Sequence, residues 1–261
     1  MDIQKQWKEP EAWYRSFPFW AWNGRLEKEE LIRQIRLLKE AGVGGFFIHS
    51  RDGLETEYMG PEWMDCVKAA VQEAKRLGMC AWLYDEDRFP SGTAGGSVTA
   101  CGDAYRCKGL ALEVLEAGAY ERVWQEEIRE RLRDEQGKCA GDEAGCGGRT
   151  VDCESGGGRF TDERTGFLAA YAACIEGEKL LSFRRLEMKE TEIFRDREVL
   201  LVVRLAVSAP SEWFNHQAPP DNLNPDCVKK FIALTHEKYR ETVGEEFGAV
   251  IPGIFTDEPS L

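Results

Sequence analysis

The sequence predicts an α/β fold in which consecutive βα units build a parallel sheet, and three observations support this. Over the first hundred residues, short apolar runs alternate with amphipathic stretches at helical spacing. Each apolar run ends in polar or ionisable residues, which is the arrangement at the functional face of a (β/α)8 barrel. The 261 residues are also close to the length of one such barrel, about 250.

The first predicted unit is a strand, a turn and a helix. An aromatic run over 17–22 is closed by Asn23 and Gly24, and a stretch over 27–40 carries apolar residues at helical spacing. Gly42 follows and is typical of a helix end. This pattern places Asn23 at the carboxyl end of the first strand.

The second and third units repeat the pattern. The apolar runs 45–48 and 80–84 are continuous, as in buried parallel strands, and a helix that starts at Pro61 and ends at Gly78 separates them. Polar residues follow both strands: His49, Ser50 and Arg51 after the first, and Asp85, Glu86, Asp87 and Arg88 after the second.

The pattern then changes, which divides the chain into three parts. Residues 1–103 carry the first three βα units, and residues 104–208 carry β-branched and aromatic runs between Gly-rich and charged stretches. We interpret 104–208 as an inserted β-rich subdomain with one charged helix over 120–136. Residues 209–261 carry a further helix and a fourth strand over 253–255.

The composition narrows the classes of function. The net charge is −13 and no run of Lys or Arg exceeds two residues, which argues against a nucleic-acid partner. No window approaches the roughly 18 apolar residues of a membrane span, and the first nine residues lack an apolar signal core. We therefore expect a cytoplasmic protein with no membrane partner.

The cysteines give no metal signature. None of the nine forms a C-x-x-C pair of the kind that binds zinc or performs redox chemistry. Cys139, Cys146 and Cys153 are evenly spaced, but they lie in a Gly-rich stretch without a histidine and predict a loop. The sequence requires no cofactor.

The polar strand ends are the candidate site. Glu258 is the candidate acid, because a carboxyl group at a strand end and followed by proline can be held rigidly. Candidate substrate-binding residues are Trp22, Asn23, His49, Arg51, Asp85, Glu86, Asp87 and Asp257. Close carboxylates raise one another's pKa and can bind hydroxyl groups. The alternatives are a core position for Trp22, a buried histidine paired with an acid for His49, and a solvated turn for Asp85 to Arg88.

Four ordered motifs resemble the N-terminal barrel region of bacterial glycoside hydrolases related to family 106, the α-L-rhamnosidase-like enzymes. They are FPFWAWNG at 17–24, GGFFIHSR at 44–51, WLYDEDRFPSG at 82–92 and PGIFTDEP at 252–259. The resemblance implies a TIM (β/α)8 barrel that is interrupted after its third strand by a β-rich insert. It also implies that Glu258 is the proton-donating glutamate, and that a calcium ion near the sugar is used by some members.

Members of that family are longer and carry the partner carboxylate on a later strand, which this chain lacks. Removing the 105 residues of the insert leaves 156 for the barrel, against about 250 for a complete one. We therefore expect a partial barrel of about four strands, and a separate chain could supply the rest.

The expected function is that of an N-terminal part of a glycoside hydrolase that cleaves O-glycosidic bonds in glycans or plant glycosides, with little activity in isolation. The alternative is a non-catalytic carbohydrate-binding or interaction module. A metal-dependent hydrolase is disfavoured because the chain has three histidines, although carboxylates could bind Ca²⁺.

Overall fold

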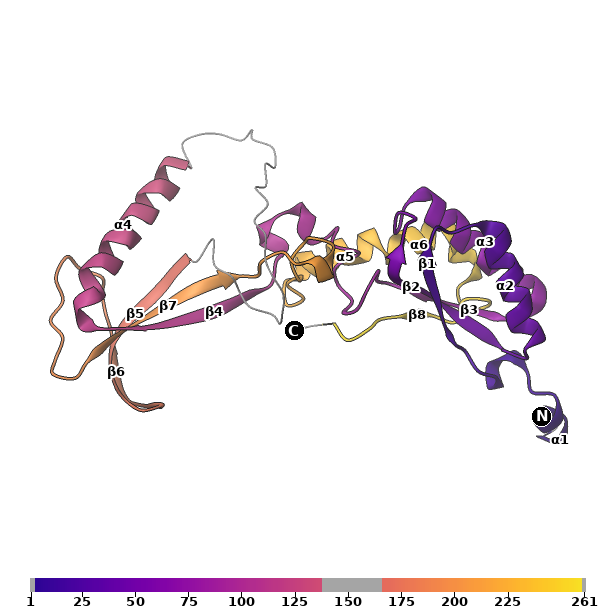
Figure 1. The fold of residues 1–261 in the computed structure, drawn as a ribbon, viewed down its shortest axis with the longest axis horizontal. Coiled ribbons are helices and arrows are strands. Elements are labelled where there is room, and N and C mark those ends of the chain that lie inside the picture. The colour runs from indigo at the N-terminus through magenta and orange to yellow at the C-terminus, as the bar shows by residue number, and fades with distance from the viewer. Residues whose placement is uncertain (1–2, 138–165, 260–261) are drawn as a thin grey trace. The chain divides into compact units, whose positions relative to one another are not determined.

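The computed structural model describes residues 3–137 and 166–259, which form two compact units (Figure 1). Unit 1 falls within Met1–Cys107 and Pro210–Leu261, and unit 2 within Lys108–Ala209. The predicted loop with Cys139, Cys146 and Cys153 lies outside the described residues. Among the helices of the described ranges, none is both long and apolar enough to cross a membrane.

Unit 1 contains a parallel sheet of four strands. They are β1 (Phe19–Gly24), β2 (Gly45–Leu54), β3 (Cys80–Tyr84) and β8 (Ile254–Phe255), in the spatial order β1-β2-β3-β8. The predicted α/β fold with parallel strands is confirmed. The sheet is open, because β1 and β8 do not pair with each other in the described part of the chain, and no closed barrel is formed.

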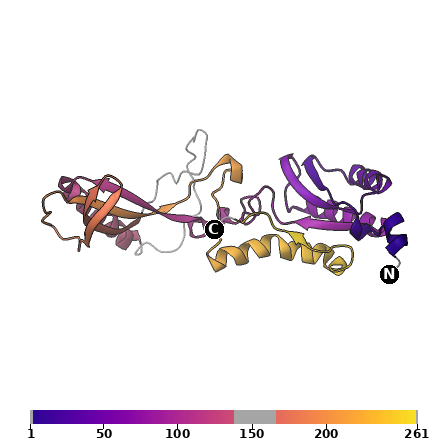
Figure 2. The same ribbon diagram turned by 90° about the horizontal axis from the view of Figure 1, so that it is seen from below.

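Helices cover one face of this sheet. α2 (Lys28–Glu40) and α3 (Pro61–Leu77) follow β1 and β2, and α6 (His236–Val243) packs beside α3. α5 (Pro225–Leu234) directly precedes α6, roughly in line with it (Figure 2), and its Cys227 and Phe231 pack with Ala94 and Val98 of the loop after β3. Side chains of the strands that point toward the helices form one buried apolar cluster with them: Trp22, Phe46, Ile48, Ala81 and Leu83 from the strands, and Leu31, Ile35, Val67, Ala70 and Tyr239 from the helices. The short α1 (Ile3–Lys8) precedes the sheet.

Local sequence explains the ends of these elements. Pro61 occupies the first turn of α3, where its missing N–H costs nothing, and Gly78 ends the helix with a left-handed φ of 62°. Asn224 caps α5 by accepting a hydrogen bond from the backbone N–H of Asp226. β2 is longer than predicted, so that His49, Ser50 and Arg51 belong to the strand itself.

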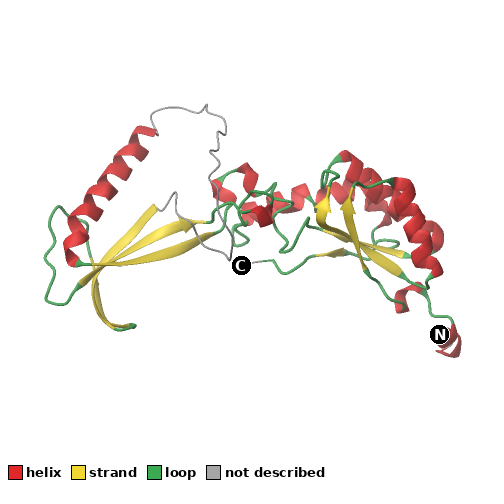
Figure 3. Ribbon diagram, viewed as in Figure 1, coloured by secondary structure: helices red, strands yellow, loops and turns green. Residues whose placement is uncertain are grey.

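Unit 2 is built on an antiparallel sheet with the strand order β4-β7-β5-β6 (Figure 3). Its strands are β4 (Lys108–Leu115), β5 (Gly166–Glu176), β6 (Lys179–Arg185) and β7 (Val199–Val207). One face packs against α4 (Tyr120–Gly137), the helix predicted over 120–136, through a buried cluster. The members of that cluster are Tyr120, Val123, Ala170, Ala172, Leu186, Leu200 and Val202.

Candidate functional site

The carboxyl ends of the four parallel strands lie at one edge of the unit 1 sheet, and side-chain hydrogen bonds join those of β2, β3 and β8 there. Ser50 of β2 donates to Asp87, which follows β3, at 2.6 Å. Thr256, which follows β8, donates to Asp85 at 2.6 Å. These bonds bring together polar residues that lie on or follow three separate strands, namely Ser50, Asp85, Asp87 and Thr256.

Glu86 is a fully buried acceptor that shapes the loop after β3. Its two carboxylate oxygens accept bonds from six donors at 2.6–3.1 Å: the backbone N–H groups of Asp87, Gly92, Thr93, Ala94 and Gly95, and the hydroxyl of Thr93. Positive φ angles at Gly92 and Gly95 let the backbone turn its N–H groups inward. Burial raises the pKa of Glu86 to about 7, and the hydrogen bonds act in the opposite direction. Glu86 therefore organises the loop and has no oxygen left for a ligand.

Asp85 ties the loop after β3 to the segment after β8. Its side chain is fully buried, and its two oxygens accept hydrogen bonds from Ser91 and Thr256, each at 2.6 Å. Nε2 of His236, at the start of α6, lies 3.6 Å from the same carboxylate. Burial raises the pKa of Asp85, while the two hydroxyl donors lower it. Asp85 is thus an internal anchor that does not face solvent.

Ser91 completes this anchor through its backbone and side chain. The Ser91 N–H donates to the carbonyl of Asp257 at 2.7 Å, and the Asp257 N–H donates to Oγ of Ser91 at 2.9 Å. The same Oγ donates to Asp85. Both backbone groups of Asp257 are therefore fixed, one residue before Glu258. We call Asp85, Ser91, Thr256 and Asp257 the strand-end clasp.

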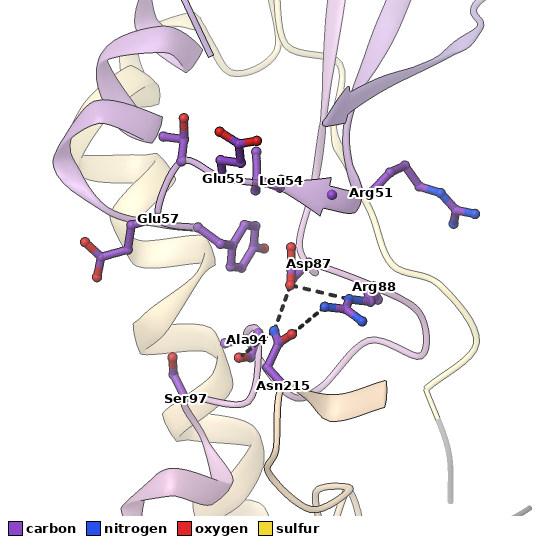
Figure 4. A pocket seen from close by; sticks show the side chains of 13 residues that line it. Arg51, Leu54, Glu55, Glu57, Asp87, Arg88, Ala94, Ser97 and Asn215 are labelled. Atoms are coloured by element: carbon purple, nitrogen blue, oxygen red, sulfur yellow. Dashed lines mark hydrogen bonds and ion pairs between the residues drawn. The ribbon is translucent and has the colours of Figure 1, made fainter. Parts of the chain in front are cut away.

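Asp87 bridges β2 to a distant loop and borders a pocket of about 310 Å³ (Figure 4). One oxygen accepts from Ser50, and the other accepts from the side-chain amide of Asn215 at 2.8 Å. Arg88 pairs with Asp52 at 3.1 Å and donates to Asn215. Figure 4 shows Asp87, Arg88 and Asn215 turned toward one another, with Arg51 pointing away from them. These groups hold one another at the pocket wall, although the buried Nε of Arg88, 3.8 Å from Asp87, makes no hydrogen bond among the described residues.

His49 lies on the sheet face that the helices do not cover. It is 6% exposed and stacks on Tyr84, with ring centroids 4.2 Å apart and an interplanar angle of 8°. Burial and then the charge of Arg51 lower the pKa of His49, and the charge of Asp257 opposes them. Its buried Nδ1 and the Tyr84 hydroxyl have no hydrogen-bond partner among the described residues. Buried polar groups are normally paired, so these two atoms are exceptions, and both are buried in this structure.

Below His49, the same face is aromatic. Phe19 contacts Phe47 and Phe255 at ring-centroid distances of 4.9 and 5.2 Å, and Phe47 stacks on Trp82 at 5.2 Å. Phe19 is 55% exposed although it lies on a parallel strand. Parallel sheets are normally covered on both faces, but α2, α3 and α6 cover only the other face of this one, and on this face Trp13 stacks on Trp82 at a ring-centroid distance of 6.4 Å.

Glu258 is exposed and adopts a φ of +40°. Non-glycine residues rarely adopt this region, and such positions are enriched at functional sites. In the part of the chain that the structure describes, its carboxylate makes no hydrogen bond or ion pair. The candidate acid is therefore free to meet a substrate, on a segment that the strand-end clasp holds.

The remaining predicted site residues fall into three groups: a core residue, two exposed residues and two internal hydrogen-bond acceptors. Trp22 is 1% exposed and packs edge-to-face with Trp20 and Trp63 in the core. Side chains alternate along β1, which turns Trp22 toward the helices. Its assignment as a substrate-binding residue is therefore corrected. Asn23 and Arg51 are exposed, on strands β1 and β2. Glu86 and Asp85 are structural acceptors, so neither contacts a substrate directly.

Sequence reasoning missed four residues that build this edge: Ser91, Thr256, Asn215 and His236. Ser91 and Thr256 stood inside the quoted motifs, where a hydroxyl near an acidic run could have been noticed. No sequence pattern indicates that Asn215 contacts Asp87 or that His236 contacts Asp85, because each pair is separated by more than a hundred positions.

Calcium, which the resemblance implies for some enzymes, needs six to eight oxygen ligands. The described residues contain no group of three His, Cys, Asp or Glu side chains placed to hold a metal ion. The oxygens of Asp85, Glu86 and Asp87 already accept hydrogen bonds from protein donors. The described residues do not fit a calcium ion at this edge, and no step below uses one.

No family model and no curated protein matches the sequence. Among solved structures, a rhamnosidase from Novosphingobium sp. PP1Y is similar over 45% of this chain, with 21% sequence identity and a TM-score of 0.32. The similar region covers 12% of the rhamnosidase chain, so this chain spans a small part of that protein's length.

Proposed function

We propose that this chain is the part of a rhamnosidase-like glycoside hydrolase that carries the general acid and binds the sugar. The observation that supports this most is the strand-end clasp, which fixes both backbone groups of Asp257 and leaves the adjacent Glu258 carboxylate free. A general acid has to be held at the scissile bond while its carboxyl group stays accessible. The four motifs of the sequence lie at this same edge.

In this proposal, the Glu258 carboxyl donates its proton to the glycosidic oxygen as the bond to the sugar carbon breaks. The leaving group departs as an alcohol, and positive charge develops on the sugar ring. Asn23, His49, Arg51 and Asp257 bind the sugar hydroxyls. Burial and the charge of Arg51 lower the pKa of His49 and so favour the neutral imidazole, which can both donate and accept a hydrogen bond.

Cleavage also needs a second carboxylate, about 5–5.5 Å away for retention or 6.5–9.5 Å for inversion. The buried carboxylates of Asp85 and Glu86 are occupied. We propose that a further polypeptide segment, on a separate chain or a longer one, supplies this carboxylate with the remaining strands of a (β/α)8 barrel. The uncovered aromatic face and the outer edges of β1 and β8, unpaired in the described ranges, support this.

We also place the protein in the cytoplasm. Six cysteines of the described ranges are free thiols, which suits a reducing compartment: Cys66, Cys80, Cys101, Cys107, Cys174 and Cys227.

The test is hydrolysis of a panel of aryl glycosides, including an α-L-rhamnoside, by the gene product that contains the remaining strands. We expect Glu258→Gln to lower kcat by at least about a hundredfold, the lower range for loss of a general acid. Glu40→Gln, an exposed acid at the end of α2, is the matched control and should leave kcat unchanged. Undiminished turnover by Glu258→Gln would overturn the assignment. The 261-residue chain alone should show little hydrolysis.

One observation favours the second candidate, a carbohydrate-binding module that performs no chemistry. The acidic run after β3 forms internal hydrogen bonds, so the described part of the edge offers fewer free carboxylates than its sequence suggests. Calorimetry with monosaccharides and oligosaccharides separates the candidates. Tight binding without turnover, even with the remaining strands present, would support the binding module.

A further inference from the structure

The antiparallel sheet of unit 2 has one face that α4 does not cover. Side chains alternate along each strand, and on β4 this leaves Leu110, Leu112 and Val114 exposed by 74%, 61% and 57%. Their partners across the ladder are Leu205, Val203 and Leu201 of β7. Every one of these six side chains is aliphatic.

β5 and β6 continue this face. Ala169 and Tyr171 of β5 pair with Val203 and Leu201 of β7, and Tyr171 meets Phe183 of β6 with ring centroids 5.9 Å apart. Phe183 is 65% exposed. We call this surface the open face. It consists of Leu110, Leu112, Val114, Ala169, Tyr171, Phe183, Val203 and Leu205, with the buried Leu201 between Val114 and Tyr171.

A continuous apolar surface of this kind marks an association site, whereas single exposed apolar residues are normal on any protein. The open face is poorly suited to a sugar, because sugars stack on aromatic rings and need polar groups for their hydroxyls. Its residues are mostly branched aliphatic side chains. The surface that packs best against such side chains is a second apolar sheet.

The size of the open face is sufficient for a dimer. Four strands about 4.8 Å apart are roughly 19 Å wide, and the eight residues of β4 at about 3.4 Å each are roughly 27 Å long. The face therefore covers about 500 Å², and two such faces bury about 1,000 Å² in total. That is about the threshold for a biological interface, and it lies in the size range of weak, reversible complexes.

We propose that two copies of this chain associate through their open faces and form a two-sheet sandwich across a two-fold axis. Such an interface is self-complementary, because an apolar face without charged side chains at its centre can pack on itself without burying an unpaired charge. Stacked sheets pack about 10 Å apart with interdigitated side chains. In this dimer the exposed interdigitating side chains are those of Leu110, Leu112, Val114 and Phe183. Arg185, opposite Tyr171 on β6, lies at the rim.

The test is sedimentation equilibrium of the 261-residue chain over a wide concentration range. We expect a reversible monomer–dimer equilibrium, and Leu112→Glu should weaken it at least about a hundredfold, because it places a charge at the centre of an apolar interface. Ile193→Glu is the matched control, since Ile193 is 85% exposed in the same unit but lies outside the open face. It should leave the equilibrium unchanged.

Phe183→Lys provides a second variant at the far side of the face and should weaken the dimer as well. Circular dichroism should show the wild-type spectrum for all three variants, because each changed side chain is more than half exposed. A chain that stays monomeric at every concentration would overturn the proposal. A dimer that withstands both Leu112→Glu and Phe183→Lys would also overturn it.

Discussion

Replacing Ser91 by alanine tests whether the strand-end clasp holds the segment before Glu258. The Ser91 hydroxyl is buried, donates to Asp85 at 2.6 Å and accepts from the Asp257 N–H at 2.9 Å. Alanine removes both bonds and leaves a buried acceptor and a buried donor without partners. Each such group costs about 1–3 kcal/mol. Asp85 keeps its bond from Thr256, so we expect a loss of about 2–4 kcal/mol.

The loss should be local, because the backbone bond from the Ser91 N–H to the Asp257 carbonyl remains. The assay is native-state hydrogen exchange followed at the amide of Asp257. At about 1.4 kcal/mol per factor of ten, its exchange should accelerate about 30- to 1,000-fold. Ser211→Ala, an exposed serine of the same unit, is the control and should leave this rate unchanged. Equal exchange rates for Ser91→Ala and the wild type would refute the clasp.

Four further substitutions test the burial and the electrostatics of unit 1. Trp22→Ala should lower the free energy of unfolding by about 3–5 kcal/mol in urea, as for a core residue, whereas Phe19→Ala on the uncovered face should cost much less. Arg51→Ala should raise the pKa of His49 in an NMR titration, since the charge of Arg51 lowers it, and an unchanged pKa would contradict this. The pKa of Glu73 is lowered to about 2 by hydrogen bonds from arginines on α2 and α3. Its contribution to stability should be present above about pH 4.5 and disappear as the pH falls toward 2, and Glu73→Gln should remove that dependence.

The order of elements in unit 1 could be predicted because its signals are local. Apolar periodicity located α2, Pro61 and Gly78 marked both ends of α3, and the run 80–84 gave β3 with its observed bounds. The face on which each side chain lies was harder to predict. Trp22 and Asn23 are neighbours in sequence, yet alternation turns Trp22 into the core.

The roles of the acidic residues after β3 could not be predicted from sequence. A run of Asp85, Glu86 and Asp87 indicates negative charge, but whether the charges face a substrate depends on the donors around them. For Glu86 five of the six donors are backbone N–H groups, which every residue except proline carries. For Asp87 one donor is Asn215, 128 positions away. Tertiary structure alone decides that these carboxylates are internal.

The most direct test of the central claim, that the carboxyl edge of the parallel sheet binds a sugar, is an NMR titration of the 261-residue chain with a panel of monosaccharides that includes L-rhamnose. We expect saturable shifts for one of these sugars, confined to amides at Asn23, His49, Arg51, Asp257 and Glu258. Glu258→Gln should retain them, because the acid acts on the bond and the neighbouring residues bind the ring. The account is contradicted if no sugar produces a saturable shift, or if the shifts fall elsewhere.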